Sequence, residues 1–223
     1  MIKLFTSDII GFVRAAIDEL QPNSSLMEIL TDADSQDLDH IIEANILKAV
    51  NVIHSTAPHI LAAKDADSLS QEDNVEVDGK TILIHFTEKG LLRPLALAAT
   101  DSNYTVTEFI PEDSLEAAKQ NDPYVCGTYQ RPAVVLRYGD NGPYLQYYSL
   151  REAPGVSASG EDYVRKLLYF PIPKIETEDN KQYVSINRYL ENAILSYLTG
   201  LVLATFKDQN AETYFNLAKA HLT

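Results

Sequence analysis

The chain has a single cysteine, no tryptophan and few cations. The lone Cys126 excludes an intrachain disulfide, which suits a reducing cytoplasm, and we expect it to be a small buried residue. The 18 Lys and Arg residues are outnumbered by 32 Asp and Glu residues, giving a net charge of -14. A nucleic-acid groove needs clustered cations that displace counterions, and the longest basic run is Arg165-Lys166. High-affinity, sequence-specific nucleic-acid binding is therefore disfavoured.

Long hydrophobic runs are also lacking. The N-terminal residues reach Asp8 without the apolar core of a secretory signal. The longest apolar stretch, Ala193 to Phe206, is shorter than the roughly 20 residues that cross a bilayer, so it predicts a buried helix and no membrane partner. Hydrophobic residues nevertheless make up 45% of the chain, enough for an ordinary core.

Phosphate-cradling and nucleophile-elbow motifs do not occur in the sequence. There is no G-x-x-x-x-G-K-[ST], no G-x-G-x-x-G and no G-x-S-x-G, and residues 155–160 predict only a small-residue loop. His54 and His59 are five residues apart across Pro58, whereas two ligands on one helix face need a spacing of four. The histidines are therefore expected to be surface or cap residues.

Acidic residues form patterns that could bind calcium or perform acid–base chemistry. Asp32, Asp34, Asp37 and Asp39 resemble a calcium loop, but Asp37 occupies the position that requires glycine, which favours a helix start. The acidic runs Glu112-Asp113 and Glu176-Glu178-Asp179 are typical of helix starts and solvated loops. We predict no catalytic residues, no metal site and no cofactor, so the chain is not expected to be an enzyme.

Helical periodicity characterises both ends of the chain. A first helix is expected from a Ser7 cap to Pro22, and a second from Asp34 or Ser35 to Pro58. Near the C-terminus the pattern predicts helices from about 184 to 206 and from 211 to 221, the latter capped by Asp208. We expect their apolar side chains to pack together, namely Leu198, Leu201 and Val202 against Tyr214, Phe215 and Leu217.

The central region changes to strand-like patterns. The clearest is a hairpin of residues 133–138 and 144–148 around a Gly/Asp/Asn loop. The other expected elements are strands at 82–86, 95–98, 106–110 and 164–172, a short helix at 111–118, a short strand or turn at 26–30, and loops at 65–78 and 152–162.

Tyrosine is abundant, with 13 residues, and several surround the predicted hairpin. Tyrosine is enriched at protein interfaces because it combines a large contact area with a polar tip, and it is also a good strand former. The sequence leaves both explanations open for Tyr129, Tyr138, Tyr144, Tyr147, Tyr148 and Tyr163.

These patterns predict an α+β fold. N-terminal and C-terminal helices, residues 1–79 and 176–223, would form a helical bundle, and residues 80–175 would form a central, mostly antiparallel β insertion.

The helix–β–helix order resembles the head-to-tail connector (adaptor or ring) proteins of tailed bacteriophages, and the ring proteins of crAss-like bacteriophages most. The resemblance is carried by the helices around 8–13 and 38–46, by the β segments 92–95, 129–133 and 142–148, and by the closing helices around 197–203 and 211–215. It implies a virion protein of the phage neck, assembled in the host cytoplasm into a homo-oligomeric, dodecameric ring. That ring would dock on the portal protein and other neck or tail proteins, and genome DNA would pass through its lumen.

Two other interpretations remain compatible with the sequence. One is a cytoplasmic bacterial α+β binding module without catalytic activity. The other is an enzyme whose site is assembled from scattered residues.

Overall fold

A computed structural model describes residues 1–20, 32–68, 74–78, 81–86, 90–99, 104–122, 124–128, 130–140, 142–148 and 164–223. The fold class is α+β, as predicted, with six α-helices and three mostly antiparallel sheets in the described ranges. The segment predicted at 26–30 and the loop predicted at 152–162 lie outside these ranges. The chain divides into two compact units, unit 1 (residues 1–65 and 173–223) and unit 2 (residues 66–172).

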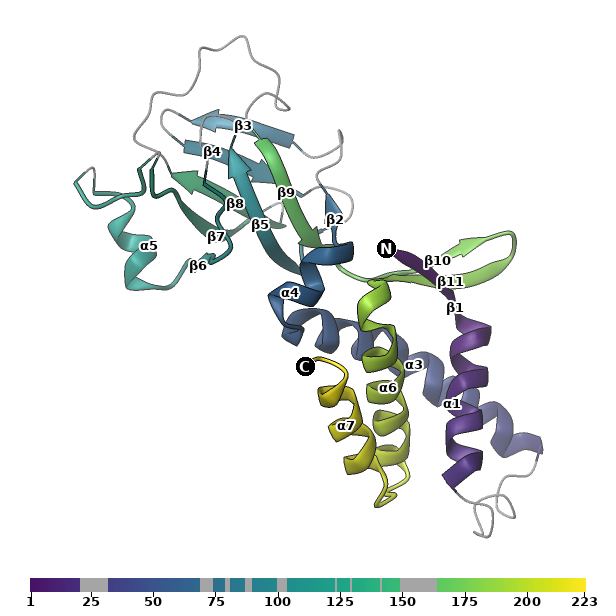
Figure 1. The fold of residues 1–223 in the computed structure, drawn as a ribbon. Helices are drawn as coiled ribbons and strands as arrows, with labels where there is room; N and C mark the ends of the chain where they lie inside the picture. The colour runs from purple at the N-terminus through teal and green to yellow at the C-terminus, as the bar shows by residue number, and fades with distance from the viewer. Residues whose placement is uncertain are drawn as a thin grey trace. The chain divides into compact units, whose positions relative to one another are not determined.

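Unit 1 joins helices from both ends of the chain (Figure 1). Its helices are α1 (Thr6–Leu20), α3 (Asp32–Thr56), α4 (His59–Ala62), α6 (Glu191–Thr205) and α7 (Ala211–Ala220). The α1 and α3 stripes expected from helical spacing are largely buried, with Ile9, Val13, Ile42 and Val50 at 2% exposure or less. Helix α1 starts at Thr6, one residue before the predicted Ser7 cap, and α3 starts at Asp32, two or three residues before the predicted start at Asp34 or Ser35.

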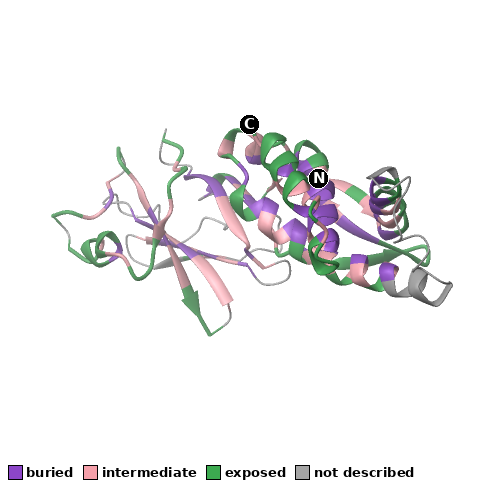
Figure 2. Cartoon of the chain, turned by 90° about the horizontal axis from the view of Figure 1, so that it is seen from below, coloured by how far each residue is buried: buried purple, intermediate pink, exposed green. Residues whose placement is uncertain are grey.

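Helix α6 is the centre of unit 1, because it packs against α1, α3 and α7. It is buried on most of its circumference, which explains the apolar run that the sequence shows there. Figure 2 shows the buried residues of the chain in purple along its helices and strands. Leu198 and Val202 are buried as predicted. Leu201, Tyr214 and Phe215 are only partly buried, and Leu217 on α7 is exposed, contrary to the prediction. The close approach of α7 depends on Gly200, since a Cβ atom there would lie 2.8 Å from the Phe215 ring.

A three-stranded sheet completes unit 1 and corrects the predicted start of the third long helix. Its strands are β1 (Ile2–Phe5), β10 (Ile175–Glu178) and β11 (Lys181–Ile186), in the order β1-β11-β10 with antiparallel pairing. Residues 184–186 therefore belong to a strand, and the α-helix starts only at Glu191. The hairpin turn has positive φ at both Asp179 (50°) and Asn180 (61°), a conformation that Asp and Asn tolerate well.

A buried polar junction connects the end of α3 with the segment that follows β11. The side chain of Asn187 donates to the Ala62 carbonyl at 3.0 Å and accepts the Tyr189 N–H at 2.9 Å. The Asn187 N–H also points to Nε2 of His54, at the long distance of 3.5 Å. Burial lowers the pKa of His54 to about 4, because the low-dielectric interior disfavours the imidazolium. His54 is therefore neutral at physiological pH and part of the core.

Next to this junction, the Asp65 carboxylate accepts the Arg188 N–H at 3.0 Å and pairs with the Met1 ammonium at 2.9 Å. Partial burial of Asp65 opposes its ionisation, but these two donors outweigh burial and lower the pKa of the carboxyl. The junction thus ties three distant parts of the chain together through groups that the sequence does not relate.

The described residues of unit 2 form two sheets and one short helix (Figure 1). The first sheet has the order β3-β4-β8-β7-β6, and the second has the order β2-β9-β5. The elements are β2 (Asp67–Ser68), β3 (Asn74–Asp78), β4 (Thr81–His85), β5 (Arg93–Ala99), β6 (Ile110–Pro111), α5 (Leu115–Lys119), β7 (Ala133–Gly139), β8 (Gly142–Tyr148) and β9 (Val164–Phe170). The predicted hairpin is confirmed as β7 and β8.

The two faces of the five-stranded sheet bury different partners, because strand side chains alternate in direction. Val134, Leu145 and Tyr147 share one apolar cluster with Leu97 and Leu167 of the other sheet. The opposite face carries a smaller cluster in which Val135 and Tyr148 pack with Ala117 of α5.

Several predicted boundaries in unit 2 are corrected by strand pairing. The predicted loop 65–78 contains β2, paired with β9, and β3, paired with β4. The predicted strand 106–110 is reduced to a bridge at Val106 and the start of β6, and the short helix begins at Leu115 instead of 111. The two compact units meet in sequence at 65/66 and 172/173, whereas the predicted division was at 79/80 and 175/176.

Candidate interaction site

The connection between β5 and β7 carries the candidate site. It includes β6 and α5, and α5 begins at a capped position: the Ser114 hydroxyl accepts the Ala117 N–H at 3.1 Å and donates to the Pro111 carbonyl at 2.8 Å. On the inner side of α5, Ala117 is buried against the sheet. The outer side presents Leu115, whose exposed fraction is 67%.

After α5 the chain turns sharply into a tip formed by residues 124–126. Two acceptors of Asp122 organise this turn, since Oδ1 accepts the Tyr124 N–H at 2.9 Å and the carbonyl accepts the Cys126 N–H at 2.9 Å. Gln120 Oε1 accepts the Gly127 N–H at 2.8 Å. At Gly127 a Cβ atom would lie 2.6 Å from the Ala133 nitrogen, so only glycine lets the chain approach the sheet this closely. The tip is thus held by its own hydrogen bonds and by the sheet.

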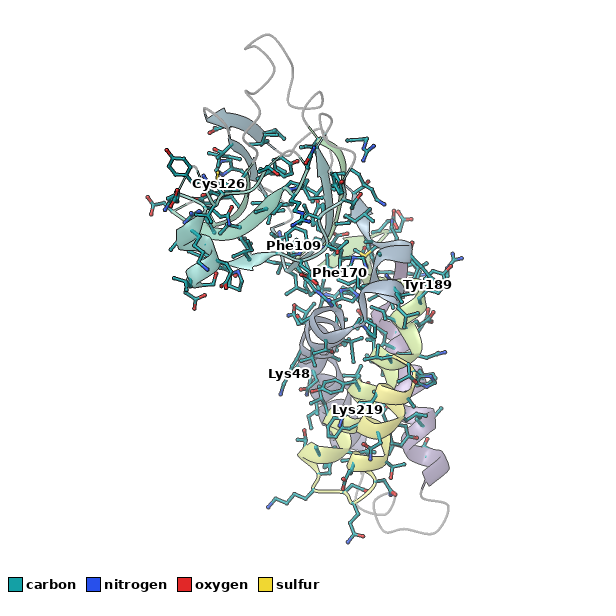
Figure 3. The ribbon with its side chains drawn as sticks, turned by 60° about the vertical axis from the view of Figure 1, so that its left-hand side comes forward. Lys48, Phe109, Cys126, Phe170, Tyr189 and Lys219 are labelled. Carbon is teal, nitrogen blue, oxygen red and sulfur yellow. The ribbon has the colours of Figure 1, made fainter. Side chains whose placement is uncertain are left out.

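The side chains of the tip point away from the core that holds it. Tyr124 is 95% exposed and Val125 57% exposed, and Cys126 is partly exposed. The expectation that Cys126 is a buried residue is therefore wrong, because the tight turn places it on a projecting segment instead of in a strand. Figure 3 shows Cys126 and Phe109 at separate positions of unit 2.

A pocket of about 610 Å³ opens beside the β6–β7 pair. Its walls are mainly apolar, and two carboxylates belong to its lining; the lining residues are Phe109, Pro111, Glu112, Asp113, Leu136 and Tyr138. Pockets of this size are typical of sites that accept a ligand or an anchoring side chain.

Glu112 fixes the position of this lining. Its Oε2 accepts the Tyr138 N–H at 3.0 Å, and its Oε1 lies 3.5 Å from Nη1 of Arg137. Arg137 is in turn fixed from the sheet, because its Nη2 donates to the Tyr148 hydroxyl at 3.0 Å. This network joins the connection to β7 and β8, so that the pocket has a preorganised wall.

The histidines and aspartates considered for metal binding are not brought together into a metal site. His54 is buried in unit 1, so the expected surface or cap position is wrong for it, and His59 lies at the start of α4. The helix-start interpretation of the aspartates agrees with α3, which begins at Asp32, and Asp39 pairs with Arg14 at 2.8 Å. Among the described residues no group of three His, Cys, Asp or Glu side chains is arranged to hold a metal ion.

The acidic pairs are placed in structural roles. Glu176 and Glu178 are on the exposed strand β10, where Glu176 accepts the Tyr183 hydroxyl and Glu178 pairs with Lys3 at 2.7 Å. In the run Glu112-Asp113, the Glu112 carboxylate accepts the Tyr138 N–H in the pocket wall. Asp113 also lines the pocket, and its side chain is exposed.

The structure supports strand packing for some of the hairpin tyrosines and places Tyr138 at the surface. Tyr147 and Tyr148 are buried in strand packing, and Tyr144 stacks on His85 at a centroid distance of 5.2 Å. Tyr138 is 67% exposed at the pocket. Tyr129 and Tyr163 lie outside the described residues. Tyr124, the most exposed of the tyrosines described, was missed because it stands apart from any strand pattern; the Asn-Asp-Pro turn signal before it was its only mark in the sequence.

No family model, no curated protein and no solved structure matches the chain. None of the helices in the described ranges combines the length and apolar character needed to cross a membrane.

Proposed function

We propose that the chain is a structural subunit of the head-to-tail connector of a tailed bacteriophage, forming a ring in the neck between portal and tail. The observation that carries the proposal is the 124–126 tip: an ordered turn that presents a tyrosine and a valine to solvent. Aromatic side chains anchor protein interfaces, because they bring a large contact area and lose little conformational freedom when they are buried.

The segment order supports the connector more than an unspecified binding module. Helices from both ends of the chain share unit 1, and the β strands between them form unit 2. This arrangement corresponds to the helix–β–helix plan by which the sequence resembles connector proteins.

The distribution of charge also fits a channel that DNA traverses. Each unit has 16 acidic and 9 basic residues, so both carry the same net negative charge. An acidic surface repels phosphates and offers little counterion release, which would allow DNA to pass without being held.

The test is the oligomeric state of the purified chain, measured by mass photometry and negative-stain electron microscopy, with and without the portal protein. We expect closed rings in at least one of the two conditions. Tyr124→Ser with Val125→Ser should abolish them, whereas Ile60→Ser, which removes an exposed apolar side chain of unit 1, should not. A chain that stays monomeric in both conditions contradicts the proposal.

A further inference from the structure

We infer that the 124–126 tip of one copy of this chain inserts into the Phe109–Tyr138 pocket of the next copy. The inference deepens the proposed ring function and rests on it. It names both halves of the contact between subunits, and both halves belong to unit 2.

The tip does not fill the pocket of its own subunit. Tyr124 and Val125 are exposed, and the pocket lining includes neither of them nor Cys126. The apolar tip and the apolar pocket of one subunit are therefore both open to a neighbouring copy.

Two different complementary surfaces on one molecule produce a heterologous, head-to-tail contact. Such contacts repeat from copy to copy and close into a ring when the rotation between neighbours allows it. A symmetric dimer would instead require one self-complementary surface.

Charge favours a second copy as the occupant. Arg131 is exposed at the turn five residues after Cys126, where its N–H donates to the Thr128 carbonyl at 2.9 Å. At the pocket, Glu112 already pairs with Arg137, so the exposed Asp113 is the carboxylate that a neighbouring copy can approach. Insertion of the tip would bring Arg131 towards Asp113, and opposite charges at an interface select the register in which two partners meet.

The area that the tip can bury is that of one anchoring side chain and not of a whole interface. Burying an aromatic side chain removes roughly 150–250 Å² from solvent, whereas a stable interface buries about 1,200–2,000 Å² in total. The tip in its pocket would therefore be the central hot spot, with further contacts around it.

Because Cys126 is the sole cysteine of the chain, it provides a built-in probe of the contact. Two single-cysteine proteins are mixed under mild oxidation: the natural chain, with Cys126 in the tip, and a tagged Cys126→Ser chain carrying Asp113→Cys or Tyr138→Cys at the pocket. The matched control carries Asp140→Cys, an exposed position outside the pocket lining. Unchanged thermal melting of each variant shows that it folds.

We expect at least one pocket cysteine to give a mixed disulfide about tenfold or more above the Asp140→Cys control, because docking raises the effective concentration of the two sulfurs to the millimolar range. Tyr124→Ser in the natural chain should reduce this product to the control level, and Leu115→Ser should leave it unchanged.

Failure of the inference is distinguishable from failure of the proposed function. Rings without mixed disulfides at either pocket position overturn the inference alone, as do mixed disulfides that persist with Tyr124→Ser. The absence of rings both with and without portal protein overturns the proposed function and the inference together.

Discussion

Acidification from neutral pH to about pH 5 should destabilise unit 1 through His54. The folded protein holds this imidazole neutral with a pKa of about 4, whereas an unfolded chain has the ordinary value of 6.5. Between these two values the unfolded state binds more protons than the folded state. The contribution of His54 to stability is therefore fully present above pH 6.5 and is lost as the pH falls towards 4.

The expected magnitude follows from the two pKa values. The full difference corresponds to about 3.4 kcal/mol at 1.36 kcal/mol per pKa unit. Between about pH 7.5 and pH 5 the linkage relation gives a loss of about 2 kcal/mol. The pKa of Asp65 is lowered from its ordinary value of 3.8, so its effect on stability changes mainly below pH 4, outside the range from pH 7.5 to pH 5.

Urea unfolding followed by circular dichroism at 222 nm is the appropriate assay, because most helical residues belong to unit 1. His54→Leu removes the titrating group and should reduce the difference between the two pH values by about 2 kcal/mol, whatever its effect on absolute stability. His221→Gln, at an exposed position after α7, serves as the control and should preserve the difference. If His54→Leu kept the full pH dependence, the imidazole would not be buried and neutral, and the described junction would be wrong.

Three further predictions concern the α6–α7 contact and DNA. Leu198→Ala should lower the free energy of unfolding by about 2–5 kcal/mol in chemical denaturation, and a loss below about 0.5 kcal/mol would mean that Leu198 is exposed. Gly200→Ala should lower the free energy of unfolding by about 1–3 kcal/mol, because its methyl group meets the Phe215 ring. Gly11→Ala, whose methyl group would have no atom within 4 Å, should leave the free energy of unfolding unchanged or raise it by up to about 1 kcal/mol. Equal effects of the two substitutions would refute the close α6–α7 packing. Fluorescence anisotropy should detect no duplex DNA binding at about 0.15 M salt, where the Debye length is about 8 Å, and a micromolar, steeply salt-dependent affinity would reveal a basic patch.

The helical bundle could be predicted because it depends on local periodicity. The apolar stripes of α1 and α3 and the apolar run of α6 specify which faces are buried before any partner is known. The β7–β8 hairpin was predictable for the same reason, since both strands and their turn are adjacent in the sequence.

Long-range pairing could not be predicted from local patterns. Residues 2–5 become a strand only because residues 183–186 lie beside them. That pairing also removes residues 184–186 from the apolar helical pattern that they would otherwise extend. The turn residues Asp179 and Asn180 were the local sequence signal for the β10–β11 hairpin.

The candidate site was only partly visible in the sequence. The hairpin tyrosines were identified as interface or packing residues, and Tyr138 does lie at the pocket. The tip, however, depends on hydrogen bonds from Asp122 and Gln120 and on the close approach at Gly127. Such a turn has no periodicity, so its exposed Tyr124 could be recognised only in the structure.

The proposed role as a ring-forming subunit of a phage neck can be tested by electron cryo-microscopy of the neck in purified particles whose genome encodes the chain. We expect a closed ring of this protein between portal and tail, surrounding the DNA channel. A well-resolved neck in which no density fits the helical unit 1 or the two-sheet unit 2 would contradict it.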